Sequence, residues 1–336
     1  MSNQTLTIAI PTFNRCSVLL ENLKHLLPQI DKNVDILIID NCSDIEVENF
    51  LKQKIKAYDN KIKIVRNTVN IGSNANILRC IEYCESDYIW ILGDDDFPLP
   101  DALEKIKFFL AYGDAIWINF HSNDFQPKRI SGAKVGSMVD FLNHLESINE
   151  LVFMSNNIYK TSYIKKGLSE AYLNIDMMAP HLISMLYGVI KSNSIGNYYI
   201  TRNNLFLSIA NNKDKASSWS LFRVFIGTTT IFQLPVSKDI SKELMRLVRG
   251  ARKNWLANKY MVAAFWELSS TQGVIKALQM SSHLIINLLL IDRFKYVVSL
   301  PLYLFSIFTG SYFWPHKEMI KKAYKKLLLF RNEKIR

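Results

Sequence analysis

The stretch Asp87-Tyr88-Ile89-Trp90-Ile91-Leu92-Gly93-Asp94-Asp95-Asp96 decides the fold of this 336-residue chain. Its apolar part predicts a buried strand, and that strand ends at three successive aspartates. Neighbouring carboxylates repel one another, so folding alone gives no reason to gather three of them. A divalent cation gives one, because Mg²⁺ and Mn²⁺ prefer hard oxygen ligands and keep coordination places for phosphate oxygens. A solvated acidic turn is the alternative interpretation.

The segments around this stretch predict a sheet. Apolar runs predict strands at residues 6–10, 35–39, 61–65 and 88–92, and further strands at 115–120, 151–159 and 194–200. Apolar residues at helical spacing predict helices at residues 18–27, 47–55 and 75–84. Strands that alternate with helices favour an α/β fold, with a mostly parallel sheet and helices on both faces.

Polar residues follow each of the first four predicted strands. They occupy residues 11–15, 40–44, 67–74 and 94–96. Right-handed crossovers bring the carboxyl ends of parallel strands to one edge of a sheet, and α/β proteins bind ligands there. Some of these residues are also favoured helix caps, Asp40 and Ser43 among them. Capping does not require all four groups together, so we expect a binding site at this edge.

Four motifs at this edge resemble, in order and spacing, the family 2 glycosyltransferases, whose fold is the Rossmann-like GT-A fold. They are Ile10-Pro11-Thr12-Phe13-Asn14-Arg15, Ile39-Asp40-Asn41-Cys42-Ser43-Asp44, Asn70-Ile71-Gly72 and Gly93-Asp94-Asp95-Asp96, and the resemblance covers roughly residues 5–120. It implies a nucleotide-sugar donor and a Mn²⁺ or Mg²⁺ ion. It also implies that Asp40 bonds the base and that Asp96 and Asp94 ligate the metal. The remaining donor-binding residues that it implies are Pro11, Thr12, Asn14, Arg15, Asn70, Gly72, Asp94 and Asp95.

A narrower resemblance is to abequosyltransferase-like enzymes of O-antigen assembly. It rests on residues 92–96, on residues 67–76 (NTVNIGSNAN) and on Ala179-Pro180-His181-Leu182. It implies a lipid-linked oligosaccharide as the acceptor.

The acceptor hydroxyl needs a general base on the opposite face of the sugar if the anomeric centre inverts. The family resemblance implies a carboxylate beyond the middle of the domain, in the stretch from Asn174 to His181. Asp176 is the first candidate for this base and His181 the second. The alternatives are that Asp176 caps the following helix and that His181 is a satisfied, half-buried imidazole.

Positive charge is concentrated toward the C-terminus. The formal net charge is +11, and residues 317–336 hold eight Lys or Arg against two Glu. Residues 296–314 are uncharged over 19 positions, which is long enough for a bilayer span, although Pro301 and Gly310 weaken that interpretation. Two interfacial helices or a buried core pair are the alternatives. Apolar residues alternate with lysines after Lys317, as in a basic membrane-surface helix, so we expect a membrane partner rather than nucleic acid.

These observations predict a GT-A domain at 1–218, a helical and partly membrane-associating region at 219–316 and a basic tail at 317–336. We expect a metal-dependent glycosyltransferase of bacterial surface polysaccharide or O-antigen synthesis, on the cytoplasmic face of the cell membrane. A nucleotidyltransferase is one alternative, although residues 11–15 lack the glycines of its phosphate loop. A non-catalytic, membrane-associated protein on a GT-A scaffold is another. The motifs of dinucleotide enzymes and P-loop NTPases are absent from the sequence.

Overall fold

The computed structural model describes residues 4–55, 61–122, 129, 131–192, 196–208, 221–251 and 258–313. The chain forms two compact units. One contains Met1–Lys215 and Ile231–Gly250, and the other contains Ala216–Thr230 and Ala251–Arg336. This division differs from the boundary expected at residue 218, because residues 231–250 return to the first unit. The expected basic tail, 317–336, lies outside the described residues.

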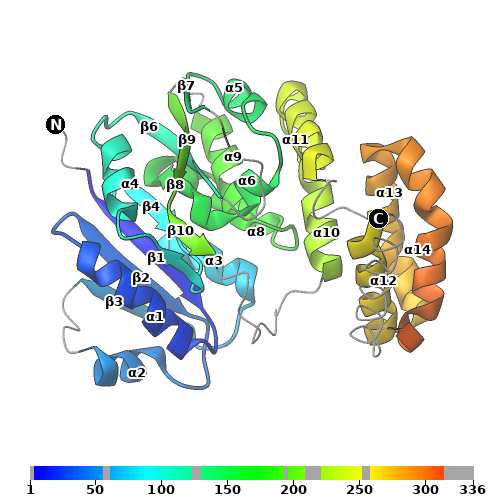
Figure 1. Ribbon diagram of the computed structural model, residues 1–336, viewed down its shortest axis with the longest axis horizontal. Coiled ribbons are helices and arrows are strands. Elements are labelled where there is room, and N and C mark those ends of the chain that lie inside the picture. The colour runs from blue at the N-terminus through cyan, green and yellow to red at the C-terminus, as the bar shows by residue number, and fades with distance from the viewer. Residues whose placement is uncertain are drawn as a thin grey trace, which may run out of the picture. The chain divides into compact units, whose positions relative to one another are not determined.

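An eight-stranded sheet organises the first unit (Figure 1). In spatial order its strands are β3 (Ile62–Arg66), β2 (Val34–Asp40), β1 (Leu6–Thr12), β4 (Tyr88–Ile91), β8 (Asn157–Lys160), β6 (Ala115–His121), β9 (Asn197–Asn204) and β7 (Ala133–Val135). The first four are mutually parallel, so their carboxyl ends share one edge. The expected α/β architecture is confirmed.

Strand β8 is shorter than the strand that the sequence predicts. A strand was expected over 151–159, but residues 149–152 form helix α6 (Asn149–Val152) and a 3-10 turn, η2 (Met154–Asn156), follows it. Local hydrogen bonds explain the difference, because the Asn157 amide donates to the carbonyl oxygens of Glu150 and Phe153. The strand that remains pairs antiparallel with both β4 and β6.

Helices cover both faces of the sheet (Figure 1). On one face, α1 (Cys16–Leu26), α2 (Val47–Lys54) and α4 (Ala102–Leu110) share a hydrophobic core with alternate residues of the strands. In α1 the buried positions 16, 19, 23 and 26 recur at helical spacing, which is why this helix lies flat on the sheet. On the other face, α3 (Ser73–Tyr83) packs on β1 and β2 and also contacts α9 (Pro180–Ser192).

Two glycines allow α9 to approach the segment before it. That segment contains α7 (Thr161–Ile164), η3 (Lys165–Gly167) and α8 (Leu168–Leu173). A Cβ atom on Gly188 would lie 2.0 Å from the carbonyl oxygen of Tyr163, and one on Gly167 would lie 1.9 Å from that of Ser184. Backbone therefore packs directly against backbone at both crossings.

The returning segment completes the first unit. It contains η4 (Ile231–Gln233) and α11 (Lys238–Gly250), which packs on α5 (Met138–Asn143). The Arg246 guanidinium donates to the carbonyl oxygens of Leu142 and Leu145, at 2.7 and 2.9 Å. Arg246 thus ties α11 to the last turn of α5 and to the residue that follows its C-cap.

The second unit is helical. Its described helices are α10 (Leu221–Thr230), α12 (Asn258–Gln272), α13 (Val274–Ile291) and α14 (Arg293–Phe313). Helix α14 packs closely on α12, where a Cβ atom on Gly310 would lie 2.7 Å from the Trp266 carbonyl oxygen. Buried polar groups join the helices: Ser269 donates to the Ile307 carbonyl oxygen, and the Asn287 amide donates to Thr229 at 3.4 Å.

Candidate active site

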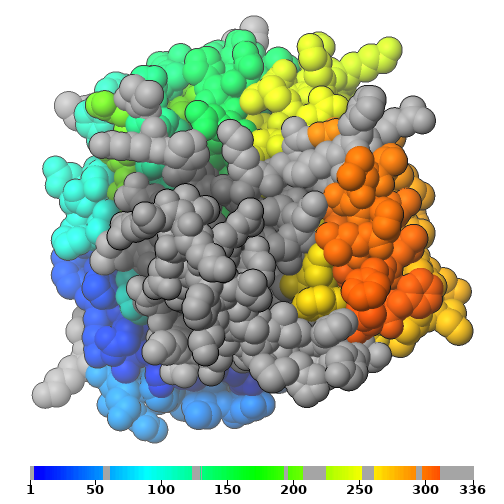
Figure 2. Space-filling view, turned by 45° about the vertical axis from the view of Figure 1, so that its right-hand side comes forward, coloured from blue at the N-terminus to red at the C-terminus, as the bar shows by residue number. Residues whose placement is uncertain are grey.

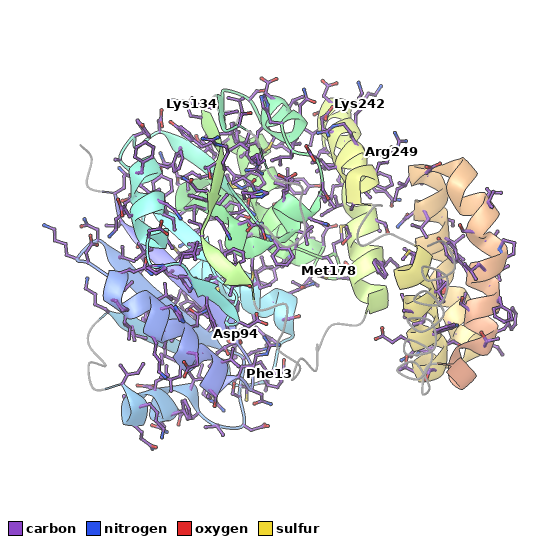
Figure 3. All side chains as sticks on the ribbon, viewed as in Figure 1. Phe13, Asp94, Lys134, Met178, Lys242 and Arg249 are labelled. Carbon is purple, nitrogen blue, oxygen red and sulfur yellow. The ribbon has the colours of Figure 1, made fainter. Side chains whose placement is uncertain are left out.

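The structure brings the end of β1 onto the acidic triplet that follows β4. Asp94 accepts a hydrogen bond from the Thr12 hydroxyl and another from the Arg15 guanidinium, both at 2.9 Å. Arg15 also lies 3.3 Å from a carboxylate oxygen of Asp95. Figure 3 shows Phe13 and Asp94 at the same end of the sheet. The strand-end grouping that the sequence predicts is therefore present in the fold.

Burial sets the electrostatics of this pair. Asp94 is only 6% exposed, and burial raises the pKa of its carboxyl group, while Arg15 opposes that rise. Burial lowers the pKa of Arg15, but Asp94 and Asp95 more than compensate and the net change is upward. Arg15 therefore pairs with two of the three carboxylates of the triplet, those of Asp94 and Asp95.

Two buried side chains fix the turn that carries the triplet. The Asn22 amide, on α1, donates to the carbonyl oxygens of Gly93 and Asp96, at 3.0 and 2.9 Å. The Ser155 hydroxyl donates to the Asp96 carboxylate at 2.6 Å and accepts from the Gly93 N–H at 2.9 Å. A Cβ atom on Gly93 would lie 2.7 Å from that carboxylate, which would then have to move from its present position over the turn.

The carboxylates suit a metal ion that arrives with a phosphate ligand. Within the described residues, no cluster of three or more His, Cys, Asp or Glu side chains could hold an ion alone. Mg²⁺ is usually bound by one or two carboxylates together with substrate phosphates and water. Asp95 and Asp96 fit that pattern. Asp94 was also expected to ligate the metal, and in this structure its two oxygens accept hydrogen bonds from Thr12 and Arg15.

Asp40, the residue expected to bond the base, is paired within the protein in this structure. Its side chain is buried, one oxygen pairs with Arg66, and the other accepts from the Ser43 N–H at 2.9 Å. Arg66 donates in addition to the Ser43 carbonyl oxygen at 2.8 Å. In this conformation Asp40 therefore positions Arg66 and the loop after β2, instead of presenting its carboxylate to a base.

Asparagines shape the loop before α3. The Asn41 oxygen accepts from the Asn67 amide and the Ile71 N–H, both at 3.0 Å. The Asn41 amide donates to Asn70 at 2.8 Å, and Asn70 also accepts from the Gly72 N–H. Gly72 has φ +85°, a left-handed value that glycine adopts without strain. Asn70 and Gly72 thus set the start of α3, a helix whose N-cap residue has no side chain to satisfy its first N–H groups.

Asn14 joins the loops after β1 and β2. Its amide donates to the Asp44 carboxylate at 3.0 Å, and its oxygen accepts from the Asp44 N–H at 2.8 Å. Its own N–H donates to the Ser43 hydroxyl at 2.9 Å. Pro11 lies inside β1, in register with Ile39. Both expected residues therefore lie at the same edge as Asp94.

Asp176 lies in an exposed turn that is tied to α3. The Asn74 amide, in the first turn of α3, donates to the carbonyl oxygens of Ile175 and Met177, at 2.7 and 3.1 Å. These two carbonyls flank Asp176. The alternative role of Asp176 as a helix cap is wrong, because α9 begins at Pro180, directly after Ala179.

His181 is buried in the first turn of α9. It is 1% exposed, its Nε2–H donates to the Leu151 carbonyl oxygen at 3.1 Å, and burial lowers its pKa to about 4. Its Nδ1 atom has no partner among the described residues. The ring is thus more deeply buried than the half-buried imidazole of the alternative interpretation, and this environment gives no support to His181 as the base.

Comparison with known proteins shows which family the domain that carries this site resembles. Residues 7–160 match the model of glycosyl transferase family 2. These residues form a family 2 glycosyltransferase domain. Abequosyltransferase RfbV of Salmonella typhimurium is 28% identical over 170 residues, which cover 49% of this chain and 48% of RfbV. The glycosyltransferase MJ1057 of Methanocaldococcus jannaschii is 24% identical over 49% of this chain and 61% of its own length. The chain thus spans about half the length of RfbV and less than two thirds of MJ1057.

Solved structures share the fold of the glycosyltransferase domain and its C-terminal helices. S. aureus TarS 1–349 has a TM-score of 0.55 at 11% identity, covering 93% of this chain and 92% of that one. Mannosyltransferase PcManGT of Pyrobaculum calidifontis, in complex with GDP-Man and Mn²⁺, has a TM-score of 0.51 at 12% identity, covering 93% and 88%. These likenesses confirm the GT-A fold.

Sequence reasoning about the glycosyltransferase domain missed four positioning residues. Asn22 is the one polar residue in the buried stripe of α1, which was a visible signal. Arg66 lies opposite Asp40 in the β2–β3 register, so parallel pairing of these strands could have revealed it. Ser155 carried no signal, because its partner lies 59 residues away along the chain. Asn74 belongs to the polar group 67–74 expected at this edge, but its positioning role was not predicted, because its partner lies 101 residues away.

Proposed function

We propose that the protein transfers a sugar from a nucleoside-diphosphate donor to a lipid-linked saccharide during synthesis of a bacterial surface polysaccharide such as O-antigen. The observation that carries this proposal is the contact of Thr12 and Arg15 with Asp94 at the edge of a family 2 glycosyltransferase domain. The names of the relatives support it, since RfbV is an abequosyltransferase.

The donor diphosphate would lie against the edge that carries Asp95 and Asp96. A bound Mn²⁺ or Mg²⁺ would neutralise the leaving diphosphate, and Asp96 and Asp95 are the residues that would hold the ion. Arg15 is a fixed cation beside them, and its ion pairs with Asp94 and Asp95 keep it in place. Gly72 is the N-cap of α3, and the backbone N–H groups at this helix N-terminus are of the kind that bind anions.

Asp176 is the proposed general base. It is an exposed carboxylate on a turn that Asn74 holds against the start of α3, and α3 begins at the donor edge. A base there would accept the proton of the acceptor hydroxyl as that oxygen attacks the anomeric carbon. His181 is not retained for this step, because its imidazole is buried and its pKa is lowered.

The proposed acceptor sets the location. A saccharide on a lipid carrier is anchored in the membrane, so the enzyme would work as a peripheral protein on its cytoplasmic face. The net charge of +11 agrees with an anionic lipid surface.

A thermal-shift series tests the donor and the metal together. UDP, CDP, GDP and dTDP are added with Mn²⁺ or with chelator, because a ligand that binds only the folded state raises the melting temperature. We expect one of them to raise it by several degrees, only when metal is present. Asp96→Asn should abolish that rise, while Asp35→Asn, an exposed β2 control, should keep it. An equal rise with chelator, or no rise with any of the four, would overturn the proposal.

A further inference from the structure

Helices α13 and α14 form a hairpin with a single connecting residue, Asp292. One side of the hairpin packs inside the second unit. On α13 the buried residues Ala277, Ser281, Leu284 and Leu288 recur at helical spacing. On α14 the corresponding side contains Tyr303 and Ile307, and the ring of Phe265, on α12, is tilted against that of Tyr303 with ring centroids 5.2 Å apart.

The other side of the hairpin is apolar and exposed. The described part of the chain has sixteen exposed large hydrophobic side chains, and nine of them lie on these two helices. They are Ile275, Met280, Ile286 and Leu290 on α13, and Val297, Val298, Leu302, Phe305 and Phe308 on α14. Figure 2 shows part of this outer face in orange. Soluble proteins rarely leave such a concentration of apolar surface without a partner.

The polar groups of α13 indicate that it lies along a surface instead of crossing a bilayer. By length and composition it could span, with 18 residues and a mean hydropathy of 1.6. However, a third of it is buried inside the unit, where Asn287 bonds Thr229. The apolar part of α14, Val297–Gly310, is shorter. The sequence left three alternatives open for residues 296–314: a bilayer span, helices that lie in the membrane interface, and a buried core pair. Helices in the interface agree with the structure, because one side of the hairpin packs on protein and the other side is apolar and exposed.

Charge selects the partner for this face. Between Leu268 and Lys317 the only acidic residue is Asp292, whereas Lys276, Arg293 and Lys295 are basic. The chain that follows α14 adds eight Lys or Arg against two Glu over residues 317–336. An anionic bilayer complements this charge, because its negative surface potential attracts basic residues that lie near it. A second copy of the chain, also at +11, would be repelled.

We propose that the outer faces of α13 and α14 insert into the headgroup region of an anionic bilayer and hold the enzyme on it. The proposal rests on the proposed function in one respect: membrane binding would serve to capture a lipid-linked acceptor. Its evidence is separate, because it comes from the second unit alone.

Vesicle flotation of the full chain tests the proposal. Vesicles of phosphatidylcholine alone are compared with vesicles containing phosphatidylglycerol, at low and high salt. The test variant is Phe305→Gln with Phe308→Gln. The control is Phe108→Gln, on α4, with Tyr112→Gln, just after α4, because these two aromatic side chains are equally exposed. We expect the test variant to bind anionic vesicles at least about tenfold more weakly, because it loses two apolar side chains that lipid would bury. The control should bind like the unchanged protein.

Other results would overturn the proposal. One is equal flotation of the test variant and the unchanged protein. Another is flotation that does not depend on phosphatidylglycerol or on salt. A third is a dimer of the unchanged protein that the test variant fails to form. The nucleotide and Mn²⁺ thermal shift of each variant checks its folding, and Val298→Gln with Leu302→Gln replaces a variant that fails this check. Loss of vesicle binding with the nucleotide shift intact separates the membrane face from donor binding.

Discussion

Ser155 controls the acidic turn through one hydroxyl group. It bonds the Asp96 carboxylate and the Gly93 N–H, and its own carbonyl oxygen accepts from the Trp90 indole at 2.9 Å. Ser155→Ala would leave the buried Gly93 N–H unsatisfied. We expect a loss of about 1–3 kcal/mol in the free energy of unfolding, measured with denaturant, and a higher Mn²⁺ requirement. Ser282→Ala, on an exposed site of α13, should change neither quantity.

Asn74 positions the proposed base without touching substrate. Asn74→Leu keeps the size of the side chain but removes both hydrogen bonds to the turn that carries Asp176. We expect kcat to fall at least about tenfold while KM for the donor changes little, because only the base loses its position. Asn49→Leu, at an exposed position of α2, is the matched control. A fall in donor affinity with unchanged kcat would contradict this role.

His181 makes stability depend on pH. Its pKa is about 4 in the folded protein against an ordinary value of 6.5, so the unfolded chain binds the proton more readily. The stability that neutral His181 provides is complete above about pH 6.5 and is lost as pH falls toward about pH 4, by about 3 kcal/mol. Denaturant unfolding should show a flatter profile for His181→Leu over this range. An unchanged slope would mean that His181 is not the group responsible.

At the scale of elements, the sequence predicts the first four strands and the helices between them, since each has a complete apolar pattern. It does not predict β5 (Asp96–Pro98) or its antiparallel partner β10 (Phe206–Ser208). These strands have three residues each, and long-range pairing forms them instead of a local pattern. The same holds for the site: residue types predict the strand-end groups, whereas the partners that orient them come from distant segments.

Close packing of α9 supplies a test at this scale. Gly188→Ala places a methyl group 2.0 Å from the Tyr163 carbonyl oxygen, and backbone cannot move aside as a side chain can. We expect a loss of about 3 kcal/mol in the free energy of unfolding. Gly136→Ala is the matched control, because its added methyl group would have no atom within 4 Å. Equal stability of the two variants would show that α9 can shift.

The whole molecule contains two units, each with its own buried core, so we expect two unfolding transitions in calorimetry. The nucleotide with Mn²⁺ should raise one of them, and Gly188→Ala should lower that same transition. Gly310→Ala, which crowds the Trp266 carbonyl oxygen in the second unit, should lower the other. A single transition that responds to all three changes would contradict independent units.

The sequence could not predict the division between these units. Composition changes once, near residue 219, whereas the chain crosses between the units more than once, and α11 returns to the first. Nothing in the local pattern of α11 indicates which unit it joins. Its partners, Leu142 and Leu145, lie about one hundred residues earlier in the chain.

The position of β9 limits how the gene can be shortened for expression. The family match ends at residue 160, but β9 lies between β6 and β7 and begins at Asn197. A fragment that stops at residue 160 would leave one edge of β6 without its partner strand. Unpaired strand edges can pair with other chains and cause aggregation. Even a fragment that stops after β10 would discard α11. A catalytic fragment would therefore need a design that keeps α11, with the stretch between β10 and η4 replaced by a linker and the chain ended after α11.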